Sequence, residues 1–171
     1  MTLLPERSEA ADYYFRYIDK VSTTNILEYL DDQCRETVAL LSTVSESRSL
    51  RRYATRKWTL KEVISHLNDA ERVFAFRAFW FARGFVSPLP SFDQNHAAGH
   101  AVADDRTWES HVEEFRAIRT ATVTLFSQLP EVAWDRRGMA SGNEFSVRAL
   151  AFVIAGHTAH HVEMVTDRYL K

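Results

Sequence analysis

The chain has 171 residues, a formal net charge of −2 and a hydrophobic share of 46%. This length suits one domain, residues 1–171. The near-neutral charge excludes a protein built mainly to coat nucleic acid, which carries a strong basic excess. We therefore expect a small-molecule substrate and no nucleic-acid partner.

The sequence contains no candidate membrane segment. No stretch approaches the ~18 apolar residues of a membrane span, and residues 1–11 combine acidic residues with a proline rather than the apolar run of a signal peptide. We expect a cytoplasmic location and no membrane partner. The single cysteine, Cys34, allows no intrachain disulfide, in agreement with a reducing compartment. Its place on an apolar stripe favours a buried structural thiol over a nucleophile.

The first half of the chain predicts two long amphipathic helices after an N-terminal arm, residues 1–22. Within the arm, residues 13–21 fit either a short helix or an extended segment. The first helix covers about 24–44, because apolar residues recur there every three or four positions. A solvated basic connection, residues 48–57, follows. The second helix begins at Thr59, which forms a capping box with Glu62, and it ends near Gly84.

Residues 85–103 show no helical periodicity and contain Pro88, Pro90 and Gly99. A connection of this length is typical of a crossover that runs along a whole bundle. It would make the second and third helices parallel. The sequence therefore predicts an all-α, up-down-down-up four-helix bundle.

The last two helices follow the crossover. The third should begin after Asp104 or Asp105, either of which can cap it, and Pro130 ends it. Residues 131–145 are predicted as a loop. The fourth helix begins near Ser146. Its apolar seam is formed by Val147, Leu150, Ile154, His157, His161 and Met164.

Two histidines thus replace aliphatic residues in the seam of the fourth helix. His157 and His161 are four residues apart, so they differ by only ~40° in direction and ~6 Å in height, and both rings can reach one metal ion. A third ligand must come from another helix. His66 lies about two turns into the second helix, at a comparable depth if the second and fourth helices are antiparallel.

Other residues compete for places in this site. His160 points to the other side of His157 and could replace His161 as a ligand, although the seam favours His161. His96 and His100 form a rival pair in the crossover loop. His111 fits a core histidine or a group that supports a ligand. Asp93, in the crossover, could reach the metal or its bound water.

The sequence resembles a known family at several motifs. Residues 57–71, KWTLKEVISHLNDAE, match a second-helix signature W-[ST]-x-x-E-x-x-x-H-L, and residues 155–161, AGHTAHH, match a fourth-helix signature G-H-x-x-H-H. The segments 88–94, 134–136 and 141–142 add matches in the loops. Together they resemble the DinB-like superfamily of damage-inducible and thiol-transferase-like proteins, which is distinct from the DNA polymerase of the same name.

The resemblance covers about residues 12–170. It implies a four-helix bundle with a long crossover between helices two and three. It also implies one divalent metal ion held by His66, His157 and His161, positions at which this sequence keeps the family pattern. His96 and His100 are not part of that pattern. Zinc, nickel, iron and manganese all remain candidates, because nitrogen-rich sites discriminate weakly among such ions.

An ion with three histidine ligands keeps an open position, which is typical of catalytic sites. Three interpretations follow. The ion could activate a low-molecular-weight thiol for transfer or isomerisation, as the resemblance implies. It could activate water for hydrolysis, with Asp93 or Glu163 as general base or as an orienting group. It could instead stabilise a non-catalytic, stress-related protein.

The aromatic end of the second helix bears on self-association. Phe79, Trp80, Phe81 and Phe85 lie on more than one face of the helix. They could be covered by the N-terminal arm or the crossover, or they could form the interface of a homodimer, the commonest symmetric oligomer. We expect a homodimer.

Overall fold

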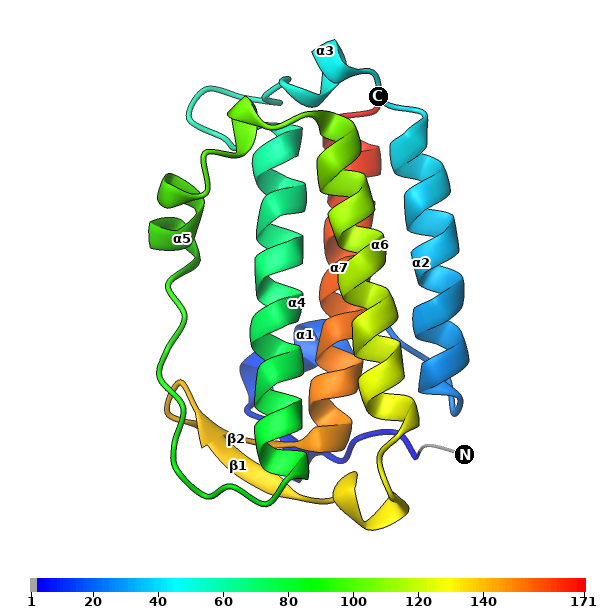
Figure 1. Ribbon diagram of the computed structural model, residues 1–171, viewed down its shortest axis with the longest axis vertical. Coiled ribbons are helices and arrows are strands. Elements are labelled where there is room, and N and C mark those ends of the chain that lie inside the picture. Colours follow the sequence, from blue (N-terminus) through cyan, green and yellow to red (C-terminus); the bar gives the residue numbers. More distant parts are fainter. Residues whose placement is uncertain (1–2) are drawn as a thin grey trace.

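A computed structural model describes residues 3–171. This part of the chain contains four long helices: α2 (Ile26–Ser42), α4 (Leu60–Ala82), α6 (Trp108–Ser127) and α7 (Val147–Arg168). They stand side by side with α2 and α7 running in one direction and α4 and α6 in the other (Figure 1). The predicted four-helix bundle with an up-down-down-up order is confirmed.

The helix starts follow from local capping, with one correction. Thr59 and Glu62 form the predicted capping box of α4, and Ser146 caps α7 by accepting from the Ala149 amide at 2.8 Å. The predicted caps of α6, Asp104 or Asp105, are wrong, because Thr107 takes that place. The Asp104 carboxylate instead accepts from the Thr59 hydroxyl at 2.6 Å, which ties the end of the crossover to the start of α4.

The N-terminal arm is helical where it meets the bundle. A short 3-10 turn, η1 (Arg7–Glu9), precedes α1 (Asp12–Ile18), which packs against α7. The contact is close because α7 carries Gly156 at this point. A Cβ on Gly156 would lie 2.0 Å from the carbonyl oxygen of Tyr17. Glycine at 156 therefore lets α1 reach α7 directly beside His157.

The connection at the top of the bundle and the crossover along its side in Figure 1 contain short elements that periodicity does not predict. The helix α3 (Glu46–Ser49) lies in the connection between α2 and α4. The crossover contains α5 (Gln94–His100) and the turn η2 (Ala103–Asp105), so the prediction of an unstructured loop is wrong over residues 94–100. The Asp93 carboxylate starts α5 by accepting from two of its first amides.

The segment predicted as a loop at 131–145 is also structured. It contains the turn η3 (Glu131–Ala133) and a hairpin of β1 (Arg137–Ala140) and β2 (Asn143–Ser146), which lies across the lower end of the bundle (Figure 1). Ser141 and Gly142 form its two-residue turn, both with positive φ, as the right-handed twist of a hairpin requires. Leu89 of the crossover exchanges two backbone hydrogen bonds with this hairpin.

The aromatic end of α4 is only partly covered. Phe81 is buried against Gly138, and Trp80 stacks on Phe85 with ring centroids 4.1 Å apart. Phe76 and Phe79 stay exposed, together with Phe85. The homodimer remains a prediction. Within residues 3–171, none of the helices has the length and apolar character needed to cross a bilayer.

A buried ion pair joins the four long helices at mid-height. Arg119 of α6 donates two hydrogen bonds to the Glu71 carboxylate of α4, at 2.8 and 2.9 Å. It also donates to the Leu30 carbonyl and the Gln33 side chain of α2, and to the Thr158 hydroxyl of α7. Arg119 is 1% exposed. Each of its neighbours is therefore held at a fixed height relative to the others.

Replacing Glu71 with alanine should destabilise the protein by about 3–5 kcal/mol, because it leaves the Arg119 guanidinium charged and buried without its partner. Denaturant unfolding measures this change. The Glu113→Ala variant is the matched control, since Glu113 pairs with Arg116 on the exposed face of α6 and should change stability by less than about 1 kcal/mol. Equal effects of the two substitutions would contradict the role given to the buried pair.

Candidate metal centre

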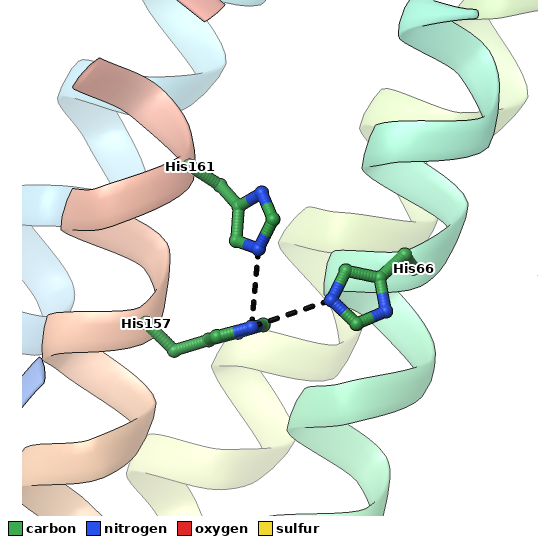
Figure 2. Close-up of side chains that lie close together, drawn as sticks. All are labelled: His66, His157 and His161. Carbon is green, nitrogen blue, oxygen red and sulfur yellow. Dashed lines mark hydrogen bonds between the residues drawn. The ribbon is translucent and has the colours of Figure 1, made fainter. Parts of the chain in front are cut away.

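Three histidines from two antiparallel helices meet inside the bundle. His66 is supplied by α4, and His157 and His161 by α7 (Figure 2). His66 and His157 are buried, and His161 is partly buried. The three ligand atoms all lie within 4.8 Å of one another. The residues predicted as ligands are therefore the ones that the fold brings together.

The distances between the rings suit one shared cation. His157 Nε2 lies 3.3 Å from His66 Nε2 and 3.2 Å from His161 Nε2. A neutral imidazole nitrogen has either one proton or one lone pair, so His157 Nε2 cannot form two good hydrogen bonds here. Nitrogens at these separations, each ~2.05 Å from one ion, would subtend roughly 105° at it, close to the tetrahedral angle.

Burial keeps these rings neutral. It lowers the pKa of His66 to about 4 and that of His161 to about 3, and it lowers the pKa of His157 well below 6.5. The ring of Trp58 lies against His66, and that of Tyr17 lies against His157, each with centroids 5.2 Å apart. Neutral imidazole is the form that binds metal, so the pocket holds its ligands ready for a cation.

The cluster lies between two cavities. One, of about 170 Å³, is lined by His66 and His157 together with Tyr17 and Arg77. The other, of about 290 Å³, lies beside His161. Trp58, Tyr53, Arg56 and Lys57 line this second cavity. A bound ion would therefore be reachable by small molecules, as a catalytic site requires and a closed structural site does not.

The other candidate residues of the site lie outside the three-histidine cluster. His160 is exposed, with its ring 5.6 Å from that of Tyr17. Glu163 pairs with Lys20 at 2.6 Å and lines a groove between α2 and α7, on another face of the helix. The Asp93 carboxylate accepts hydrogen bonds from two backbone amides of α5.

The remaining histidines and the cysteine have structural places. His96 and His100 lie on the exposed face of α5, with ring centroids 4.3 Å apart. His111 is a fully buried core residue whose Nε2 lies 2.9 Å from the Ala103 carbonyl oxygen. Cys34 is buried, and burial raises the pKa of its thiol. The chain's own thiol is therefore not placed to act as a nucleophile.

Two residues near the cluster carry no prediction from the sequence. Gly156 lets α1 approach α7, and Arg77 extends into the cavity beside His66 and His157. Gly156 stands next to His157 in the G-H motif, which is a usable signal. Arg77 lies 11 positions after His66 on the same face of α4, but arginine on a helix is too common to be noticed without the structure.

The fold and the site define a helical bundle with a buried three-histidine cluster of the kind that binds a metal ion. The chain belongs to the DinB superfamily, whose sequence model matches residues 11–165. Among solved structures, YfiT from Bacillus subtilis is similar, with a TM-score of 0.71 and 14% identity over 97% of this chain and 91% of that one. YfiT is described as a probable metal-dependent hydrolase with an unusual four-helix bundle topology. No curated protein shows significant sequence similarity to the chain.

Acid should destabilise the metal-free protein through these histidines. Unfolded histidine has a pKa near 6.5. Between pH 6.5 and about 4, the unfolded chain therefore binds protons that the buried rings do not, and stability falls as pH falls. We expect the free energy of unfolding to drop by about 2 kcal/mol per buried ring between pH 6.5 and 4.5.

Denaturant unfolding in the presence of a chelator, repeated across this pH range, measures the effect. The His66→Leu variant should show a shallower dependence on pH, whereas the His96→Leu variant, changed on the surface, should match the wild type. If His66→Leu and the wild type have the same pH dependence, His66 is not held neutral by burial.

Proposed function

We propose that this protein is a metal-dependent enzyme that binds one divalent ion through His66, His157 and His161 and activates a low-molecular-weight thiol for S-transfer or isomerisation. The observation that carries the proposal is the convergence of three neutral imidazole rings beside a cavity. His157 Nε2 lies 3.2–3.3 Å from the Nε2 atoms of the other two rings. Zinc, nickel, iron and manganese all suit such a nitrogen site.

A divalent ion held by three neutral ligands keeps its full +2 charge, with which it lowers the pKa of a thiol or a water molecule bound at its open position. The chain's own groups supply the rest. His66, His157 and His161 hold the centre from two helices. The Trp58 and Tyr17 rings pack against His66 and His157, and such apolar cover strengthens electrostatic attraction inside the pocket.

The lining of the two cavities favours a thiol over water. Among residues 3–171, no aspartate or glutamate lines either the 170 Å³ or the 290 Å³ cavity. Burial raises the pKa of Tyr17 to about 12, so this phenol keeps its proton and is a poor base. Water bound to such an ion would have a pKa near 7 and would be ionised only in part, whereas a bound thiol would be deprotonated outright. Thiol activation therefore requires fewer catalytic groups from the lining residues than hydrolysis does.

Hydrolysis is the second candidate, because the similar bundle of YfiT is described as a probable metal-dependent hydrolase. In this alternative, Asp93 or Glu163 would act as the base. Each would first have to leave its present partners, the amides of α5 and the ammonium of Lys20 respectively. A non-catalytic, stress-related role of the ion is the third. These three candidates predict different results for the metal-loaded protein. Thiol activation predicts conjugation of a thiol, hydrolysis predicts cleavage of an ester, and the non-catalytic role predicts that the ion stabilises the fold.

The purified protein, made without a histidine tag, should contain close to one equivalent of a divalent metal, and His66→Ala should lose most of it. Two remaining imidazoles on one helix hold an ion weakly because the third ligand closes the site from the other side. Elemental analysis gives the answer. His96→Ala is the control, since it removes a surface histidine and should keep the metal. Undiminished metal in His66→Ala would rule out this set of ligands.

The metal-loaded protein should join a low-molecular-weight thiol to an electrophile faster than the metal-free protein does. Glutathione or cysteine with 1-chloro-2,4-dinitrobenzene provides a direct assay, in which the sulfur forms a C–S bond as chloride leaves. A 4-nitrophenyl ester tests hydrolysis in parallel. Activity on the ester alone would favour the hydrolase. No activity on either, together with complete unfolding on chelation, would favour a structural ion.

A further inference from the structure

An arginine without an acidic partner lines the cavity beside the histidine cluster. Arg77, on α4, is 4% exposed and stands at the wall of the 170 Å³ cavity. Its Nη2 donates to the Ser141 hydroxyl at 2.7 Å and to the Pro90 carbonyl at 3.2 Å. The β-hairpin turn and the crossover therefore hold the guanidinium in place from two sides.

The charge of Arg77 is not neutralised within the protein. Among residues 3–171, no carboxylate forms an ion pair with it, whereas the other deeply buried arginine of the bundle, Arg119, has Glu71 as its partner. Tyr14 interacts with the guanidinium, but burial raises the pKa of this phenol, so it stays neutral and does not balance the charge. A buried charge costs free energy unless it is paired. An anion entering the cavity would supply the missing partner.

Arg77 and the metal centre face the same cavity from one stripe of α4. His66 and Arg77 are 11 positions apart, which is just over three full turns and roughly 16 Å of rise. Helical side chains lean towards the N-terminus of their helix, so the guanidinium comes back towards His66. A ligand that touches both must have its two functional groups several bonds apart.

We infer that Arg77 is the subsite for a carboxylate on the molecule whose thiol or other reacting group binds at the three histidines. Arginine suits this task because its guanidinium is always charged, and a hydrogen bond from Nε or Nη1 to a carboxylate oxygen would be charge-assisted. Tyr14 and Gln94, which also line the cavity, stand beside the path between the two ends. The inference rests on the proposed function and adds the class of ligand: a thiol acid rather than a neutral thiol.

A matched pair of thiols tests this subsite. 6-Mercaptohexanoate and 6-mercapto-1-hexanol have the same length and differ in the terminal charge. Binding to cobalt-loaded protein is followed by the near-ultraviolet absorption that a thiolate on cobalt produces. The acid should bind at least about tenfold more tightly than the alcohol, as expected for a charge-assisted hydrogen bond. Mercaptoacetate, which is too short to touch both ends, should not share this advantage.

Arg77→Met should remove the preference for the acid and leave the affinity for the alcohol unchanged. Arg72→Met is the control, because Arg72 lies on the same helix with an exposed side chain and pairs with Glu114. The wild-type comparison needs no variant, so it stands even if Arg77→Met folds poorly. Equal affinities for the acid and the alcohol in the wild type would overturn the subsite and leave thiol activation intact.

If neither thiol produces the absorption, thiol activation fails, and the subsite is tested without it. Hexanoate and 1-hexanol lack sulfur and can be added to the ¹⁵N-labelled protein. A shift of the Arg77 Nε–H resonance with hexanoate and not with hexanol would support the carboxylate subsite on its own. The absence of any shift with hexanoate would overturn it.

Discussion

The structure depends on a guanidinium buried where all four long helices meet. Arg119 is surrounded by groups from α2, α4 and α7, and its charge is balanced by Glu71 alone. Replacing such a pair with apolar residues is often neutral for stability, so we assign it a geometric role, which is to fix the relative positions of the helices. Apolar seams tolerate sliding of one helix past another. Five directed hydrogen bonds do not, because each is lost within a fraction of a helical turn.

The height of the metal centre follows from this network. Glu71 lies five residues after His66 on α4, and Thr158 directly follows His157 on α7. Because Arg119 binds both Glu71 and Thr158, it fixes the two antiparallel helices at the height where the histidines meet. The rings then need little further orientation. His161 Nδ1 is buried without a hydrogen-bond partner among residues 3–171, so packing, and a bound ion when present, must orient that ring.

Much of the bundle could be predicted because its signals are local. Thr59 and Ser146 mark helix starts with their own side chains, and the seam of α7 contains two histidines at the spacing of one helical turn. The pairing with His66 needed only the direction of the helices. Elements fixed by distant partners could not be read in this way. Asp104 does not cap α6 because its carboxylate is bound to Thr59, 45 positions away.

The short elements were missed for different reasons. The helix α5 is seven residues long and contains a glycine, and it shows no buried residue, so there is no apolar stripe to detect. The hairpin depends on Ser141 with positive φ, where asparagine, aspartate or glycine would have given a stronger turn signal. Arg77 could not be singled out from the sequence, because its position depends on the hairpin turn and the crossover, which both accept hydrogen bonds from its guanidinium.

Helices and connections form different parts of this site, and only the part formed by connections can change without disturbing the fold. The three imidazoles stand on rigid helices whose relative height is set by a buried network, so substitutions there disturb the fold as well as the chemistry. The far end of the cavity is shaped by Ser141 in the hairpin turn and by the crossover around Pro90, which lie outside the buried core and tolerate replacement. A bundle of this kind can therefore keep one metal-centred chemistry and exchange the ligand that it accepts by altering segments 85–93 and 141–142 alone. In this chain those segments hold Arg77 in place through Pro90 and Ser141, so the chemistry is set by the helices and the selectivity by what connects them.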